Sequence, residues 1–442
     1  MIPDKYLLYT NLSFFFFFFR KDTGVLSTTS QHTLTYPTQN NRYTTMSRKI
    51  HIAILDTDAP MPAVYTARGL YSSQFRVLLQ AAAKRLNGFN FPPVSIHTTT
   101  YDVVGGSLPP LEYLRTTPVP AAVKFQNSNY DNDKQESSSS SSSSSTFSLG
   151  PGPIDAILIT GSSASAYELD KYPWINTLQN FIQNVHTNYP HVKIFGSCFG
   201  HQIIAQALLG LSSNNNNNPH HILHVEPCPH GYEIGIHPIT LNPDFVAHFA
   251  PSFPQLARMD SFRIQLVHGD RTVHRYSSYS PSSSSSSTAT SSSSFSNLPL
   301  TLPHPWVSMG STQLCPIQGL YLPGRVLTYQ GHFEFDTFVN SETCSEFARR
   351  ANWPVPFTEA SLARINLAKS NSLSLSTAAG TAVAVDGDDD DSKLAAEMVV
   401  LFFADLVGNG AGCLGNENES TGGVENVVRA NGMITPPLIV DA

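Results

Sequence analysis

Three short apolar runs, each ending in a polar or glycine-containing turn, constrain the fold of this chain more than any other feature. They are Lys49–Leu55, Ile154–Thr160 and Val192–Gly196. Each has the length of a strand that is buried on both faces, as in a parallel sheet. Apolar residues at helical spacing lie between them, at Gln74–Leu86 and Trp174–Val185. Strands that alternate with helices predict an α/β fold with a mostly parallel sheet and helices on both faces.

Weaker patterns add further elements to this arrangement. Val94–Thr98 is a candidate second strand, and Ile203–Leu211 is an apolar helix. The stretch from Tyr232 to Tyr329 differs, because its short β-type runs are separated by Pro and Gly. Lys393–Leu406 has the spacing of an amphipathic closing helix.

Much of the length of this chain is not core material. A chain of 442 residues would ordinarily suggest about three domains, but its serine and asparagine runs are too polar to order. We therefore expect a single domain over 49–406. The expected remainder is an N-terminal extension at 1–48, insertions near 116–150, 212–219 and 277–296, an acidic loop near 386–391 and a flexible tail at 407–442.

The apolar run near the N-terminus predicts neither a membrane anchor nor a secretion signal. Leu12–Phe19 is shorter than the ~20 residues that span a bilayer, and no small-residue cleavage site follows it. Met46 leads directly into the first strand, and we expect it to be the natural start. A cytoplasmic protein without membrane contact is the resulting expectation.

Composition excludes several other classes of protein. Charged residues make up 13%, the net charge is -7, and no stripe of Lys and Arg predicts nucleic-acid binding. The five cysteines are scattered without a C-x-x-C pair, which argues against a zinc knuckle or a disulfide framework. Four histidines within His220–His230 lack ligand-like spacing, so we expect no metal and no cofactor.

The segment Ile194–Ile204 carries the sharpest chemical signal. A buried strand leads into a G-x-C-x-G turn, formed by Gly196, Cys198 and Gly200, and a helix follows at once. This is the nucleophile-elbow pattern with Cys in place of Ser. The N-terminus of the helix favours a thiolate, and the N–H of Phe199 is well placed to bind an oxyanion. The alternative is a buried structural cysteine beside glycines that pack a helix.

A cysteine nucleophile needs a base, and His332 with Glu334 is the candidate. The two residues follow a strand that ends at Gly331. In extended chain, residues two apart point to the same side, so the carboxylate can orient the imidazole and favour its protonated form. The alternative is a solvated charge pair after an edge strand.

Together these segments resemble the class I (triad) glutamine amidotransferase family, and in particular its small stand-alone fungal members and the related plant γ-glutamyl peptidases. The two central matches are Gly-Ser-Cys-Phe-Gly-His-Gln and Gln-Gly-His-Phe-Glu-Phe. The resemblance covers roughly Ile50–Phe338 and the closing helix, and it implies a three-layer, flavodoxin-like domain. Further matches in order are Ile159-Thr-Gly-Ser, Gly231-Tyr-Glu-Ile-Gly, Val267-His-Gly-Asp and Cys315-Pro-Ile-Gln-Gly-Leu-Tyr.

The resemblance implies a catalytic triad of Cys198, His332 and Glu334. Cys198 would attack the γ-carboxamide of glutamine, release ammonia and form a γ-glutamyl thioester that water hydrolyses. His332 would be the general base and acid, and Glu334 would orient it.

The resemblance also implies substrate contacts around the triad. Gly161 and Phe199 would supply the two oxyanion N–H groups, and Gln202 would help to hold the glutamine. Two positions depart from the family pattern. Phe333 replaces the usual Pro between the His and the Glu, and Ser follows Gly161 where many members have a second Gly.

Several functions remain open at this point. The substrate is glutamine or a γ-glutamyl peptide such as glutathione. Because the chain contains no P-loop, ATP-pyrophosphatase motif or second large domain, any ammonia-accepting synthase is expected on another protein. A non-catalytic regulatory subunit is a second class. A redox-sensing or deglycase-like protein is a third, and it requires an acidic residue beside Cys198 and no downstream His-x-Glu.

Overall fold

The computed structural model describes residues 47–88, 91–118, 152–210, 222–275, 302–370 and 390–408. All of them belong to one compact unit. The expected N-terminal extension, the three insertions, the acidic loop and the C-terminal tail lie wholly or mostly outside the described residues.

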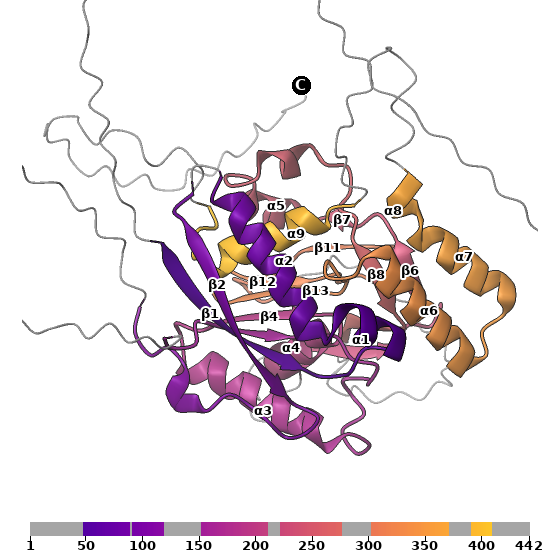
Figure 1. The fold of residues 1–442 in the computed structure, drawn as a ribbon, viewed down its shortest axis with the longest axis horizontal. Helices are drawn as coiled ribbons and strands as arrows, with labels where there is room; N and C mark the ends of the chain where they lie inside the picture. Colours follow the sequence, from indigo (N-terminus) through magenta and orange to yellow (C-terminus); the bar gives the residue numbers. More distant parts are fainter. Residues whose placement is uncertain are drawn as a thin grey trace, which may run out of the picture. The chain divides into compact units, whose positions relative to one another are not determined.

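A seven-stranded sheet forms the centre of the described unit, in the order β10-β12-β13-β4-β3-β1-β2 (Figure 1). The pairs β1–β2, β1–β3, β3–β4 and β4–β13 are parallel, and β12 and β10 continue the sheet as antiparallel strands. The predicted α/β fold with a mostly parallel sheet is confirmed. The strands are β1 Arg48–Asp56, β2 Val94–Asp102, β3 Ala156–Ile159, β4 Lys193–Ser197, β10 Val307–Ser308, β12 Leu320–Leu322 and β13 Val326–Tyr329.

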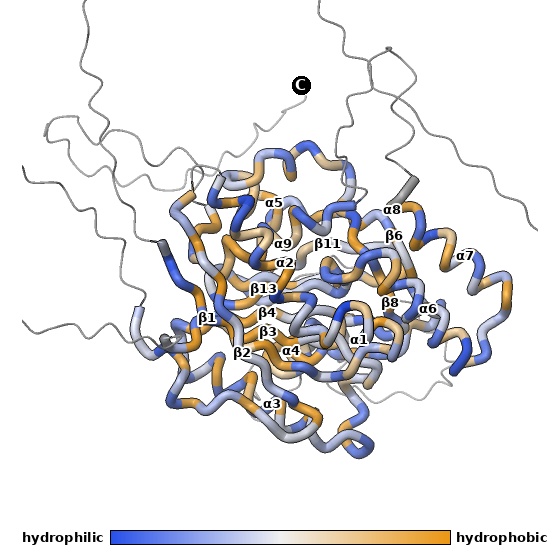
Figure 2. The backbone as a smooth tube through the Cα atoms, viewed as in Figure 1, coloured by the Kyte–Doolittle hydropathy of each residue, from blue (hydrophilic) through white to orange (hydrophobic). Residues whose placement is uncertain are grey.

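Helices cover both faces of this sheet and give it two hydrophobic cores. Alternate residues of β1 belong to different cores: Ile52 packs on one face and Ala53 on the other. The hydrophobic residues of Figure 2 accordingly concentrate along the central strands. The helices of the first face are α2 Tyr71–Leu86, α5 Pro243–Phe249 and α9 Ser392–Phe403, and those of the second are α3 Pro173–Asn188 and α4 Phe199–Leu209.

Smaller elements complete the described part of the chain. Three two-stranded ladders pair β5 with β9, β6 with β8, and β7 with β11. Their bounds are β5 Ile222–Pro227, β6 Glu233–Ile236, β7 Thr240–Leu241, β8 Gln265–His268, β9 Asp270–Arg275 and β11 Gly310–Ser311. The remaining helices are α1 Pro62–Arg68, α6 Thr337–Ala351, α7 Val355–Ile365 and α8 Leu367–Ser370, with 3₁₀ turns at Leu111–Tyr113 and Pro254–Arg258.

The structure differs from the sequence predictions in a few elements. Helix α4 begins at Phe199 rather than at Ile203. Within the stretch from Tyr232 to Tyr329, β10 pairs with β12 of the large sheet, whereas Gly310 two residues further on pairs with Leu241 of β7. Helices α6 and α7 are not among the predicted elements. Among the described residues, no helix has the combined length and apolarity needed to cross a membrane.

Candidate active site

Cys198 stands on a strained turn between β4 and α4. Its backbone has φ 51° and ψ −106°, a conformation that is costly for a residue with a side chain. Its N–H donates to the carbonyl of Tyr329 on β13 at 2.8 Å, which holds the turn against the sheet. The two glycines of the turn are sterically required, because a Cβ on Gly196 would overlap the backbone of Gly200, and one on Gly200 would overlap the carbonyl of Ile159. The predicted elbow geometry is therefore present.

His332 and Glu334 meet at the edge of the same site. The N–H of His332 donates to the carbonyl of Gln265 at 2.7 Å, which fixes its backbone. Its Nδ1 lies 2.6 Å from Glu334 Oε1, and the ring of Phe335 stacks on the imidazole at 4.0 Å. Both members of the pair are buried. The alternative of a solvated charge pair is therefore wrong.

The charges around His332 favour its protonated form. Burial alone would lower the pKa of this imidazole, but charge interactions and hydrogen bonds with Glu334 and Cys198 outweigh burial and raise the pKa to about 10. Its second nitrogen, Nε2, is buried and has no nitrogen or oxygen partner among the described residues. An imidazolium with one N–H held by a carboxylate and the other free of such partners suits proton transfer to a leaving group.

The two residues with predicted oxyanion roles both lie beside the nucleophile. A Cβ on Gly161 would lie 3.0 Å from His332 Cε1 and 3.7 Å from the Cβ of Cys198. The carbonyl of Gly161 accepts a hydrogen bond from Thr57 Oγ1 at 3.0 Å, which restrains this peptide. Phe199 begins α4, and its buried ring packs against Trp174 at 5.4 Å. These positions keep both backbone amides near Cys198.

Gln202 reaches the site through α4, but its amide is already engaged by protein groups. Its Nε2 donates to the carbonyl of Asp270 at 3.3 Å and to Gln330 Oε1 at 3.1 Å. Gln330 Nε2 in turn points at Cys198 Sγ, 3.6 Å away. With both of its N–H groups used, Gln202 can offer a substrate only its carbonyl oxygen.

A cavity of about 640 Å³ opens over these groups. Cys198, His332, Gly161 and Gln202 line one part of it, and its walls extend to residues of α6 and of the loop between β5 and β6. The acidic residues Asp58 and Asp270 also line the cavity, as do Phe347 and Arg350 of α6. Four of the six predicted site residues therefore share one cavity wall, Glu334 lies behind His332, and Phe199 is not part of the lining.

Two residues of the site were not predicted from the sequence. Ser197 Oγ donates to Glu334 Oε1 at 3.1 Å, and Gln330 contacts the sulfur of Cys198. Both residues lie within the two matched motifs, Ser197 directly before Cys198 and Gln330 two positions before His332. The motifs give no indication of the contact between Ser197 and Glu334, because that contact depends on the pairing of β4 with β13.

Among the described residues, no group of three or more His, Cys, Asp or Glu side chains is arranged to hold a metal ion. Of the predicted histidine cluster, His220 and His221 lie outside the described residues. His224 is described and lies 3.1 Å from Glu226 through Nε2.

Comparison with known proteins agrees with this class of site. No family model matches the chain. A Schizosaccharomyces pombe protein named "Putative glutamine amidotransferase-like protein" is 28% identical over 289 residues, 65% of this chain and 81% of that protein. A Saccharomyces cerevisiae protein named "Putative glutamine amidotransferase" is 28% identical over 186 residues, 41% of this chain and only 54% of that protein. The predicted resemblance to class I glutamine amidotransferase-like proteins is confirmed.

Solved structures of similar proteins include two bacterial glutamine amidotransferases. One is from Thermotoga maritima, with 13% identity, a TM-score of 0.40 and coverage of 81% of this chain and 97% of that one. The other is from Methylobacillus flagellatus, with 14% identity, a TM-score of 0.37 and coverage of 82% and 96%.

Proposed function

We propose that this chain is a cysteine hydrolase that cleaves the γ-glutamyl C–N bond of glutamine. The observation that carries the proposal is the relation of His332 to its surroundings. A carboxylate holds Nδ1, while the buried Nε2 has no nitrogen or oxygen partner among the described residues, and His332 lines the cavity that contains Cys198 on its elbow. Nucleophile, acid–base group and orienting carboxylate are the parts that acyl transfer through a thioester requires.

In the first half of the reaction, the Cys198 sulfur attacks the γ-carbonyl carbon and the carbonyl oxygen becomes an oxyanion. The N–H groups of Phe199 and Gly161 would stabilise that charge. As the C–N bond breaks, His332 Nε2–H gives its proton to the leaving nitrogen, and ammonia departs. A γ-glutamyl thioester on Cys198 and a neutral imidazole remain.

In the second half, the neutral His332 takes a proton from water as the water oxygen attacks the thioester carbon. The C–S bond then breaks, glutamate leaves, and the thiolate and imidazolium are restored. Glu334 keeps the imidazole oriented in both halves.

The alternative of a redox-sensing or deglycase-like protein fits this site less well. That alternative requires an acidic residue beside the cysteine and no downstream His-x-Glu. In the structure, the amide of Gln330 donates to Cys198 Sγ, and His332 and Glu334 are paired.

One observation favours a second substrate class, a γ-glutamyl peptide such as glutathione. The cavity of about 640 Å³ is lined by Phe347 and Arg350 of α6 as well as by Cys198 and His332, which is more room than the side chain of glutamine needs. A peptide attached to the γ-carbonyl would extend into this space. The same triad would cleave it with an amine in place of ammonia as the leaving group.

Release of glutamate from glutamine and, separately, from glutathione tests both proposals, with Cys198→Ala as the control. We expect release that depends on Cys198. Loss of Cys198-dependent release with both substrates contradicts the hydrolase and favours a non-catalytic subunit. If release from glutamine rises only when an ammonia-accepting synthase is added, the chain acts as an amidotransferase subunit in trans.

A further inference from the structure

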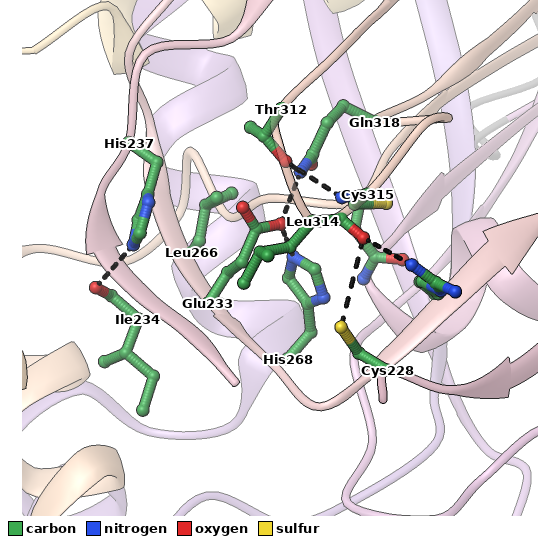
Figure 3. A network of polar contacts seen from close by, with 12 residues as sticks. Cys228, Glu233, Ile234, His237, Leu266, His268, Thr312, Leu314, Cys315 and Gln318 are labelled. Carbon is green, nitrogen blue, oxygen red and sulfur yellow. Dashed lines mark hydrogen bonds and ion pairs between the residues drawn. The ribbon is translucent and has the colours of Figure 1, made fainter. Parts of the chain in front are cut away.

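A second buried Glu–His pair lies beside the cavity, separate from His332 and Glu334. Glu233 begins β6 and His268 ends β8, and these two residues are register partners in the ladder of the two strands. Glu233 Oε2 lies 3.3 Å from His268 Nε2, with both side chains buried. Gln318 Nε2 donates to the same carboxylate oxygen at 2.9 Å. Figure 3 shows the Glu233 carboxylate between the Gln318 amide and the His268 ring.

One hydrogen bond orients the ring of His268. Its Nδ1 lies 2.9 Å from the carbonyl oxygen of Asp270, which can only accept, so Nδ1 carries a hydrogen. Burial would raise the pKa of Glu233, but its interaction with His268 outweighs burial and lowers the pKa. The Glu233 carboxylate faces the other ring nitrogen, Nε2, and so holds the ring from that side.

Two other histidines near this pair favour their neutral form. Burial, with a smaller contribution from His268, lowers the pKa of His201 on α4 to about 3. Burial is also the largest cause that lowers the pKa of His237, which follows β6.

A chain of hydrogen bonds leads from His268 to the sulfur of Cys198. The Asp270 carbonyl that accepts from His268 also accepts from Gln202 Nε2 at 3.3 Å. Gln202 Nε2 donates to Gln330 Oε1 at 3.1 Å, so the nitrogen of Gln330 is turned to Cys198 Sγ, 3.6 Å away. Because a carbonyl only accepts, each amide of the chain has one allowed orientation.

We propose that Glu233 and His268 are positioning residues for the amide N–H that reaches Cys198. The pair holds the Asp270 carbonyl, and that carbonyl sets the orientation of the two glutamine amides. A hydrogen-bond donor at the sulfur favours the thiolate over the thiol. The inference rests on the proposed function only in taking Cys198 as the nucleophile.

The test is the pH dependence of Cys198 alkylation by iodoacetamide in the full chain, followed for the peptide that contains Cys198 by mass spectrometry. Iodoacetamide carries no glutamyl group, so the measurement does not require the proposed activity. We compare wild type, His268→Gln, Gln330→Met and the double variant. Each single substitution should raise the midpoint pH of alkylation by roughly 0.5–1 unit, the effect of one lost hydrogen bond.

The double variant separates coupled effects from independent ones. If His268 acts through Gln330, the double variant shifts the midpoint no further than Gln330→Met alone. Additive shifts, or an unshifted midpoint in His268→Gln, overturn the proposal. His268→Asn keeps an N–H near the position of Nδ1. In contrast to His268→Gln, this variant should therefore have a midpoint pH close to that of wild type.

Two further comparisons keep the outcome decisive. Thermal unfolding of each variant establishes whether it folds. If His268→Gln does not fold, Gln202→Met replaces it, because this substitution interrupts the same chain of hydrogen bonds. Its shift of the midpoint pH should then be non-additive with that of Gln330→Met. Glutamate release is measured alongside. If Cys198-dependent glutamate release is found without the coupled shift in midpoint pH, this inference is refuted and the proposed function stands. If the coupled shift is found without glutamate release, the inference stands and the proposed function is refuted.

Discussion

Ser197 and Glu334 are joined by a buried hydrogen bond of 3.1 Å across 137 positions of the sequence. Ser197 is the last residue of β4 and directly precedes Cys198, while Glu334 follows His332 by two positions. The carboxylate oxygen that accepts from Ser197 is the one that lies 2.6 Å from His332 Nδ1. The strand that presents the nucleophile therefore also anchors the group that orients the base.

Ser197→Ala should lower the rate of glutamate release without unfolding the protein. The substitution removes a buried hydrogen bond to a carboxylate, worth about 1.5–3 kcal/mol, so kcat should fall at least about tenfold. The control is Ser345→Ala, because the exposed Ser345 hydroxyl donates only to the carbonyl of Ser341 in its own helix. Equal kcat values for the two variants would count against an orienting role for Ser197.

The sequence is sufficient to predict the parts of the site that are local. A buried strand, two glycines and a helix predict the elbow at Cys198, and alternation in extended chain places Glu334 behind His332. Contacts made by tertiary pairing are different. Ser197 meets Glu334 only because β4 pairs in parallel with β13, and Glu233 meets His268 only because β6 pairs with β8. No local sequence pattern predicts the register of either strand pair.

Helices α6 and α7 were not predicted from the sequence, for a different physical reason. Helix α6 buries only a narrow set of side chains, among them Val339 and Cys344, and the rest of its sequence is largely polar. The apolar repeat that identifies α2 or α3 is therefore weak there. This matters for function, since α6 supplies Phe347 and Arg350 to the cavity.

Glu334→Gln should change the pH dependence of stability. The folded pKa of His332, about 10, lies above its unfolded value of about 6.5. Stability from such a raised pKa is fully present below pH ~6.5 and is lost as pH rises through about 10. The difference in unfolding free energy between wild type and Glu334→Gln should therefore be widest near pH ~6 and shrink toward pH ~10. Urea unfolding at a series of pH values measures it.

Glu346→Gln is the matched control for that experiment. Glu346, whose side chain is partly exposed, pairs with Arg349 and Arg350, which lower its pKa to about 2. A depressed carboxylate pKa contributes at all pH values well above it, so the Glu346→Gln difference should stay constant between pH ~6 and pH ~10. A constant difference for Glu334→Gln as well would refute the assignment of the raised pKa to the His332–Glu334 pair.

Gly200→Ala should destabilise the protein by on the order of 3 kcal/mol and abolish rapid alkylation of Cys198. The added Cβ would overlap the carbonyl of Ile159 and push α4 away from β3. Gly88→Ala serves as the comparison, because its Cβ would meet only the carbonyl oxygen of Arg85 at 3.2 Å. Chemical unfolding of both variants gives the free energies; similar small losses in the two would mean that the elbow tolerates a side chain at Gly200.

Phe333, which stands where the family usually has Pro, is explained by packing. Its buried ring contacts Phe75 at 5.4 Å, Phe195 at 5.8 Å and Tyr329 at 6.1 Å between ring centroids. Phe333→Ala should therefore lower the unfolding free energy by about 3–5 kcal/mol. Phe338→Ala, at a partly exposed ring, should cost much less. If both cost the same, the ring of Phe333 is not part of the core.

Arg350→Ala should distinguish a peptide substrate from glutamine. Arg350 on α6 lines the same cavity as Cys198, and its guanidinium is suited to bind the carboxylate of a γ-glutamyl peptide. Because the side chain is partly exposed, we expect KM for glutathione to rise only about five- to tenfold, with KM for glutamine changed much less.

Arg349→Ala is the matched control. Like Arg350, Arg349 donates to Glu346 at 2.7 Å, but Arg349 does not line the cavity. Either substitution leaves Glu346 paired with the remaining arginine, so the local helix contacts stay similar. A selective loss of glutathione turnover in Arg350→Ala assigns this end of the cavity to the peptide part of the substrate. Equal changes for both substrates, or equal effects of the two arginines, would show that the extra room beyond the triad has no part in recognition.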